Sequence, residues 1–420
     1  MVFRWMRAFA LFALAPAAAL AFETVDTLPY PSLGGFPEAY APGPVYPTRV
    51  WAHVGTMYDS NPFRLADGVD PQAALGRSGK SDGIVRLGGG VGHTQRVFGR
   101  QSVNLEASGE YRDYLRFDQL DHFAYSLIGE WLWELGNDLN GSIGYGREQG
   151  LADPGEAQQV IADEVVTDRV FASANYRLGP SVRLRGGFDA GRGERSGDRP
   201  DAETDSRTWR AGIDYVTPLA NAIGVEARET QGSAPVSPLV DPTGAFADNE
   251  YIEREVALIA SYRLGEQLRF LGRVGRTKRS NTELPSDEFS GTTYRLRTDW
   301  LPTAKLGMRL DLYREPRTVL DIDATSVLVE GAAFGPRWAP TAKLVFVLQL
   351  VNERRRYNST EDPTLPLRDE TLRTWRLGAG WEPQRHIRLG AGVDYGDRSS
   401  NTLGRDYDYV QVMLSARYDW

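Results

Sequence analysis

From Thr48 onward, apolar residues recur at every second position, in short segments that are separated by turn residues. In 306–313, leucine and methionine alternate with glycine, arginine, aspartate and tyrosine, and in 387–394 aliphatic residues alternate with arginine, glycine and aspartate. Successive side chains of a β-strand point to opposite faces, so each segment has one apolar and one polar face. This pattern predicts an all-β protein in which most strands lie between an apolar and a polar environment.

An aromatic residue followed closely by a glycine or proline turn recurs at a spacing of about 40 residues. A propeller blade has a similar period, but it packs four short strands into that length. Here each interval holds two long strands, a tight turn and one long polar loop, which is the hairpin rhythm of an outer-membrane barrel. The repeated aromatics are typical of an interfacial girdle at the periplasmic side. They are Trp133, Tyr176, Tyr215, Tyr262, Trp300, Trp338 and Trp381.

The predicted fold is a transmembrane, antiparallel, up-and-down β-barrel with 18 strands, short periplasmic turns and longer extracellular loops. An even count places both ends of the barrel in the periplasm. A 16-stranded barrel is the alternative if 138–149 or 322–339 is not a strand. The predicted strands are 48–61, 83–95, 100–115, 120–135, 138–149, 162–178, 181–194, 205–217, 219–231, 249–264, 266–279, 289–302, 304–315, 322–339, 341–356, 370–383, 385–398 and 406–420.

The last predicted strand alternates up to the final residue, with Tyr418 and Trp420 completing a stripe that begins at Val410. A terminal aromatic with a second aromatic two positions earlier resembles the signal that the barrel-assembly machinery reads. An ordinary amphipathic edge strand is the alternative. A strand at the chain end can close the barrel against the first strand, which leaves no unpaired backbone edge in lipid.

The N-terminus predicts export. Arg4 and Arg7 precede an apolar run, 8–20, that is too short for a retained membrane anchor and ends in Ala19-Leu20-Ala21. We therefore expect a signal peptide at 1–21, a proline-rich periplasmic extension at 22–47 and the barrel at 48–420. Proline cannot donate to a sheet ladder, which excludes strands from the extension. The predicted location is the cell outer membrane of a Gram-negative bacterium.

Composition excludes several functions. The chain has no cysteine, so neither disulfides nor a thiolate metal site can form, and its net charge of −8 gives no basic nucleic-acid footprint. The four histidines share no metal-ligand spacing, and no nucleophile elbow or phosphate loop is present. We predict no enzyme activity, cofactor or metal site.

Two weaker patterns have alternatives. His122 lies near Ser126 and could imitate the Ser–His pair of an outer-membrane lipid hydrolase, although sequence proximity does not establish geometry. Asp59-Ser60-Asn61 could ligate calcium but lacks the rest of a calcium loop, so we interpret it as the start of a turn.

The polar faces of the predicted strands are rich in arginine and carboxylates. These side chains either brace the wall as cross-strand pairs or line a path for an anionic or hydroxyl-rich solute, because arginine presents several donors in a fixed fork. An 18-stranded barrel is too wide for side chains to fill, so a water-filled channel is expected unless loops plug it. The predicted lumen-lining residues are Arg183, Arg185, Arg210, Arg228, Arg269, Arg273, Arg295, Arg297, Arg309, Arg376 and Arg388. The carboxylates on the same face are Glu130, Asp189, Asp214, Glu226, Asp299, Asp311 and Asp394.

Two stretches, 51–65 and 117–145, together with the C-terminal strand, resemble the EpsL-type exopolysaccharide-operon outer-membrane proteins and the β-barrel porins related to them. The resemblance covers the layout of the whole mature chain. It implies a barrel in outer-membrane lipids that exports an exopolysaccharide chain, with a periplasmic polysaccharide-export protein and the inner-membrane synthesis machinery as partners. It carries no catalytic residues. A general diffusion porin for small solutes is the alternative function. The extension at 22–47 would dock the periplasmic partner, plug the lumen or act as a tether.

Overall fold

The computed structural model describes residues 47–152, 154–157, 163–195, 203–235, 248–281, 288–318, 326–357 and 367–420. The predicted signal peptide and all of the proline-rich extension except Pro47 lie outside these residues, so both remain predictions. No helix within the described ranges is long and apolar enough to cross a membrane.

The described residues form one antiparallel sheet of 18 strands. Two short helices, α1 (Pro71–Leu75) and α2 (Pro154–Ala157), and a 3-10 turn, η4 (Asp118–Leu120), lie in the connections. The strands are β1 (Thr48–Asp59), β2 (Asp82–Arg96), β3 (Ser102–Tyr114), β4 (His122–Leu135), β5 (Leu139–Leu151), β6 (Glu164–Leu178), β7 (Val182–Arg195), β8 (Thr204–Val216), β9 (Ala222–Pro235), β10 (Asp248–Leu264), β11 (Leu268–Asn281), β12 (Phe289–Thr303), β13 (Leu306–Thr318), β14 (Ser326–Trp338), β15 (Leu344–Tyr357), β16 (Asp369–Gln384), β17 (Ile387–Ser400) and β18 (Tyr407–Asp419).

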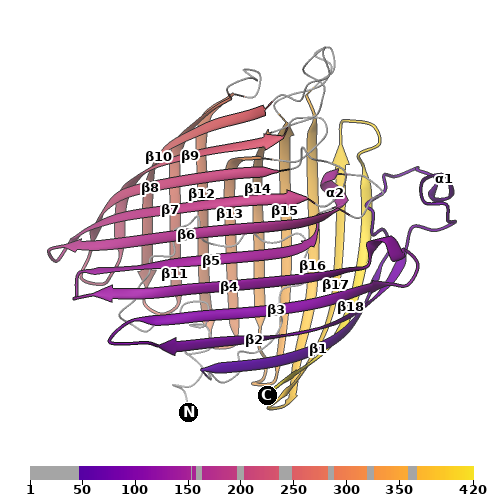
Figure 1. The fold of residues 1–420 in the computed structure, drawn as a ribbon, viewed down its shortest axis with the longest axis horizontal. Helices are drawn as coiled ribbons and strands as arrows, with labels where there is room; N and C mark the ends of the chain where they lie inside the picture. The colour runs from indigo at the N-terminus through magenta and orange to yellow at the C-terminus, as the bar shows by residue number, and fades with distance from the viewer. Residues whose placement is uncertain are drawn as a thin grey trace.

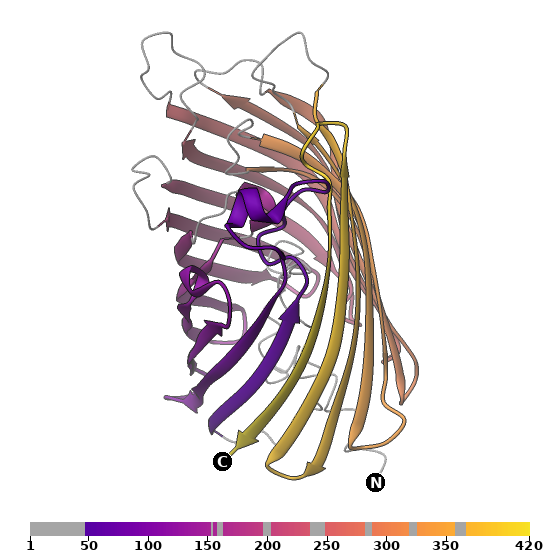
Figure 2. The ribbon, with the colours of Figure 1, turned by 90° about the vertical axis from the view of Figure 1, so that its right-hand side faces the viewer.

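Each strand pairs with its two sequence neighbours, and β1 pairs with both β2 and β18, which closes the ring (Figure 1). At the seam Trp51 lies opposite Asp419, and the backbone N–H of Trp420 donates to the carbonyl of Val50 at 3.0 Å. The strand count of 18 is confirmed, since β5 and β14 occupy the two segments on which the 16-stranded alternative depended. The start of β1 and the end of β18 lie at the same end of the barrel (Figure 2).

Strand ends differ from the predicted ones by at most four residues, and the shift at β9 has a local cause. The segment predicted to begin the strand, Leu219–Asn221, is instead a turn, in which the N–H groups of Thr217 and Asn221 bond across the segment. Ala220 takes a left-handed conformation with φ of 60°, and a strand cannot contain such a residue without breaking its ladder. The strand therefore starts at Ala222 and runs on to Pro235.

The two faces of the wall differ as the alternation predicts. On β10, Ile252, Val256 and Leu258 are exposed, whereas Glu253 and Glu255 between them are buried. An apolar face that is exposed in the isolated chain is the face that contacts lipid. The girdle aromatics lie on this outer face near the turns; Trp300, Trp338, Trp381 and Tyr262 are each about half exposed. The polar face therefore lines the interior.

Candidate functional site

The interior face carries all eleven predicted lumen arginines. Cross-strand register places each of them on the same face as the buried glutamates of β10: Arg228 lies opposite Glu255, and Arg273 lies opposite Arg295. The seven predicted carboxylates occupy this face as well. The register places these residues on one face, and their lining of a solute path remains a prediction.

At least nine of the eleven arginines form ion pairs with carboxylates of the described residues, most of them on a neighbouring strand. Arg297 bonds Asp311 at 2.5 Å, Arg309 bonds Asp299 at 2.6 Å, and Arg388 pairs with Asp419 at 3.3 Å. Arg210 and Arg269 lie on the same face. The bracing interpretation therefore describes most of these side chains.

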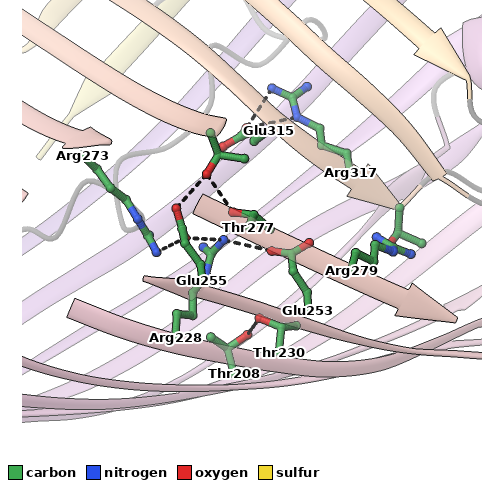
Figure 3. Close-up of polar contacts among 12 residues, drawn as sticks. Thr208, Arg228, Thr230, Glu253, Glu255, Arg273, Thr277, Arg279, Glu315 and Arg317 are labelled. Carbon is green, nitrogen blue, oxygen red and sulfur yellow. Dashed lines mark hydrogen bonds and ion pairs between the residues drawn. The ribbon is translucent and has the colours of Figure 1, made fainter. Parts of the chain in front are cut away.

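The densest part of this network runs across β7 to β11. Arg185 bonds both Asp214, at 2.7 Å, and Glu226, at 2.5 Å. Figure 3 shows the continuation, in which Glu255 accepts from Arg273 and pairs with Arg228 at 3.1 Å. The hydroxyl of Thr293 donates to Glu255 at 2.8 Å, so β12 joins the same network. In this part of the wall, charged side chains of β7 to β11 are each shared among several partners on neighbouring strands.

Arginines also stack on tyrosines along the inner face. The guanidinium of Arg368 lies 3.4 Å from the ring centroid of Tyr357, and Arg279 lies 3.7 Å from that of Tyr251. These distances fit cation–π contacts. The tyrosines stand near the extracellular ends of β10, β15 and β18. The further stacks join Arg64 to Tyr409, Arg398 to Tyr407, and Arg295 and Arg317 to Tyr313.

The connection between β1 and β2 packs with the connection between β3 and β4 into a small apolar core at the extracellular end. Phe63 and Phe117 meet edge to face with ring centroids 5.1 Å apart, and Leu65 and Leu120 complete the buried cluster. Arg64, with a left-handed φ of 52°, turns back to bond Asp59 at 3.0 Å. The ion pair between Arg64 and Asp59 and the packing of the apolar cluster therefore hold this connection in place.

The segment that carries α2 reaches across the interior. The carbonyl of Gly155, between β5 and β6, accepts a hydrogen bond of 2.5 Å from the Nη1 of Arg398 on β17. Five strands, β18 and β1 to β4, separate β17 from β5 along that side of the ring. This contact links the connection between β5 and β6 to the inner face of β17.

The two weaker sequence patterns, His122 near Ser126 and Asp59-Ser60-Asn61, form ordinary strand and turn structure. His122 is buried and its Nδ1 bonds the carbonyl of Leu120, while Ser126 donates to Glu148 at 3.3 Å. Four residues of extended strand separate them by about 13 Å, too far for a Ser–His pair. Asp59 accepts from the N–H of Asn61 at 2.8 Å, which confirms the turn. No cluster of metal-ligating residues occurs in the described ranges.

Sequence reasoning missed the tyrosine stacks and the contact between α2 and β17. Tyr407 and Tyr409 do alternate with the apolar stripe of β18, so their inward direction was available from the sequence. The bond from Arg398 to Gly155 joins residues far apart in the chain and leaves no periodic signal.

Comparison with known proteins gives a likeness of fold. The structure of OccK2 (OpdF) from Pseudomonas aeruginosa in complex with glucuronate matches with a TM-score of 0.50 and 10% identity, covering 89% of this chain and 98% of that one. This chain is an outer-membrane β-barrel. The barrel is also similar to the outer membrane protein OpdK of Pseudomonas aeruginosa, at a TM-score of 0.48, 11% identity and coverage of 89% and 99%. A BenF-like porin from Pseudomonas fluorescens Pf-5 matches at 0.46, 10% identity and coverage of 89% and 98%. No family model and no curated protein matches the barrel.

Proposed function

We propose that this barrel is a diffusion channel for small solutes, with a preference for carboxylated and hydroxyl-rich ones. The observation that carries the proposal is the mouth: the α2 segment is bound to β17 across the interior by the contact between Gly155 and Arg398. A mouth that is crossed by a buried, hydrogen-bonded segment admits small molecules more readily than a continuous polymer.

The chemistry of the wall supports the same preference. Guanidinium groups offer planar pairs of donors that match carboxylates and sugar hydroxyls. Most inner arginines are paired with acids. The wall therefore offers local hydrogen-bond donors and does not create a strong, uniform positive potential. We therefore expect mild anion preference and recognition through hydrogen bonds.

Liposome swelling tests this proposal. The full mature chain, reconstituted in liposomes, should admit glucuronate faster than glucose, and glucose faster than glucosamine. Glucuronate is a suitable probe because the similar OccK2 structure is described in complex with it. Protein-free liposomes and liposomes with heat-unfolded protein are the controls. Swelling no faster than in these controls would contradict the channel proposal, and equal rates for the three sugars would contradict the preference.

Exopolysaccharide export remains a second proposal, supported by the sequence resemblance of 51–65 and 117–145. Its partners would be the polymer and a periplasmic export protein. The comparisons favour the small-solute channel over this proposal. Polymer release from a strain lacking the barrel separates the two: normal secreted polymer would argue against export, and its loss would argue for it.

A further inference from the structure

The outer face of the wall changes from apolar to charged at one level. On β10, exposed Leu258 and Val256 are followed by Arg254, and on β11 exposed Val274 is followed by Arg276 and Lys278. Exposed aromatic residues such as Trp209 and Trp375 lie at the boundary on other strands. The charged level therefore lies at the headgroups of the outer leaflet, directly above the acyl-chain region.

Most arginines at this level have a carboxylate partner on the same outer face. Arg147 pairs with Asp168 at 2.8 Å, and Arg354 pairs with Asp369 at 2.5 Å. Further pairs join Arg192 to Glu203, Arg254 to Glu229, Arg356 to Glu330 and Arg373 to Asp397. Paired charges on an outer rim solvate one another and need no ligand.

β11 departs from this arrangement. Arg276 and Lys278 are exposed, and among the described residues no ion pair joins either of them to a carboxylate. Lys278 lies directly opposite Arg254 in the register, and like charges facing each other across strands are destabilising. On the other side, Lys278 faces Ser290 and Arg276 faces Thr292, both exposed. Arg276, Lys278 and two hydroxyl groups thus lie on one outer patch, beside Arg254, which pairs with Glu229 at 2.8 Å.

We propose that Arg276 and Lys278, with Ser290 and Thr292, bind the phosphate groups of a phosphorylated glycolipid in the outer leaflet. A phosphate beside Lys278 would balance the charge that this residue places opposite Arg254, and Arg276 can bind phosphate through two parallel bonds. The lipid is the favoured source of phosphate, since the patch adjoins the exposed apolar side chains of Val256, Leu258 and Val274, which would contact its acyl chains. Free phosphate would gain nothing from that apolar surface.

Native mass spectrometry on the folded full-length barrel in detergent tests this site, with bis-phosphorylated lipid A and its dephosphorylated form as probes. The wild type should retain the phosphorylated lipid selectively, and the double variant Arg276→Gln, Lys278→Gln should bind it about tenfold more weakly. Lys305→Gln, in the opposite, periplasmic turn between β12 and β13, is the matched control and should bind as the wild type does. Heat modifiability on gels verifies that each variant is folded.

Equal retention of the two lipids by the wild type would overturn the proposal. So would binding of the phosphorylated lipid by the double variant at wild-type strength. Binding of inorganic phosphate, without selectivity for the phosphorylated lipid over the dephosphorylated one, would also count against it. None of these outcomes depends on the channel activity of the barrel.

Discussion

The inner and outer faces of β9 to β11 carry the same residue types in different surroundings. Arg273 points inward, has only 4% of its side chain exposed, and shares Glu255 with Arg228. Arg254, on the opposite face, pairs with Glu229 alone, and 70% of its side chain is exposed. Breaking a buried pair leaves a desolvated charge behind, whereas an exposed pair is replaced by water. The contribution of an ion pair to this barrel is therefore set by the face on which it lies.

The largest effect is expected from an inner pair. Arg376, 1% exposed, bonds Asp394 at 2.8 Å, so Arg376→Met should lower the free energy of unfolding by about 3–5 kcal/mol. Urea unfolding of the reconstituted barrel, followed by tryptophan fluorescence, measures this change. Adding Asp394→Leu removes the unpaired acid and should restore most of the stability. A single variant as stable as the wild type would refute the contrast between the faces.

The next largest effect is expected from an arginine placed in the apolar band of the outer face. Leu258, 61% exposed, lies in the apolar band of β10, so Leu258→Arg should cost about 2–4 kcal/mol in a bilayer. Ile252→Arg, beyond Arg254 on the same face, should cost far less. Unfolding in lipid vesicles gives both values. Equal costs at the two positions would mean that the apolar band does not end where Arg254 begins.

A smaller effect is expected from the contact across the mouth. Arg398→Ala removes the charged donor to the Gly155 carbonyl, and such hydrogen bonds contribute about 1.5–3 kcal/mol. Release of α2 should widen the mouth, which single-channel recording would detect as higher or noisier conductance. Arg373→Ala, an outward residue on the adjacent strand β16, is the control and should leave conductance unchanged.

The smallest effect belongs to the outer pair. Arg254→Gln together with Glu229→Gln should leave the unfolding midpoint in urea unchanged within error, because both side chains are solvated. The measurement is the same fluorescence experiment as for Arg376. A loss of stability comparable to that of the inner variant would show that exposure does not decide the contribution of a pair.

Strand parity predicted which face a side chain occupies, because alternation is a property of the extended backbone itself. Parity placed Arg183 and Asp214 on one face, but their 2.7 Å contact depends on the register between β7 and β8. Alternation along a single strand does not encode the register between two strands. The contact of Arg398 with Gly155 depends on the path of a loop across the interior, and no period encodes it.

The sequence alone did not separate the charged level of the outer face from the apolar band beside it, for a related reason. Alternation separates inside from outside but does not register depth, so Arg254 in the polar zone and Leu258 in the apolar band occupy equivalent positions in the pattern. Depth becomes visible only when neighbouring strands are aligned and the change from apolar to charged residues falls at one level around the ring.

The seam between β1 and β18 has a consequence for biogenesis. The first and last strands are neighbours with nine residue pairs in register, so the ring cannot close until the final segment has been delivered. A chain that lacked β18 would leave a strand edge unpaired, and such an edge is unstable in the bilayer. Closure of this barrel therefore selects for chains that include β18.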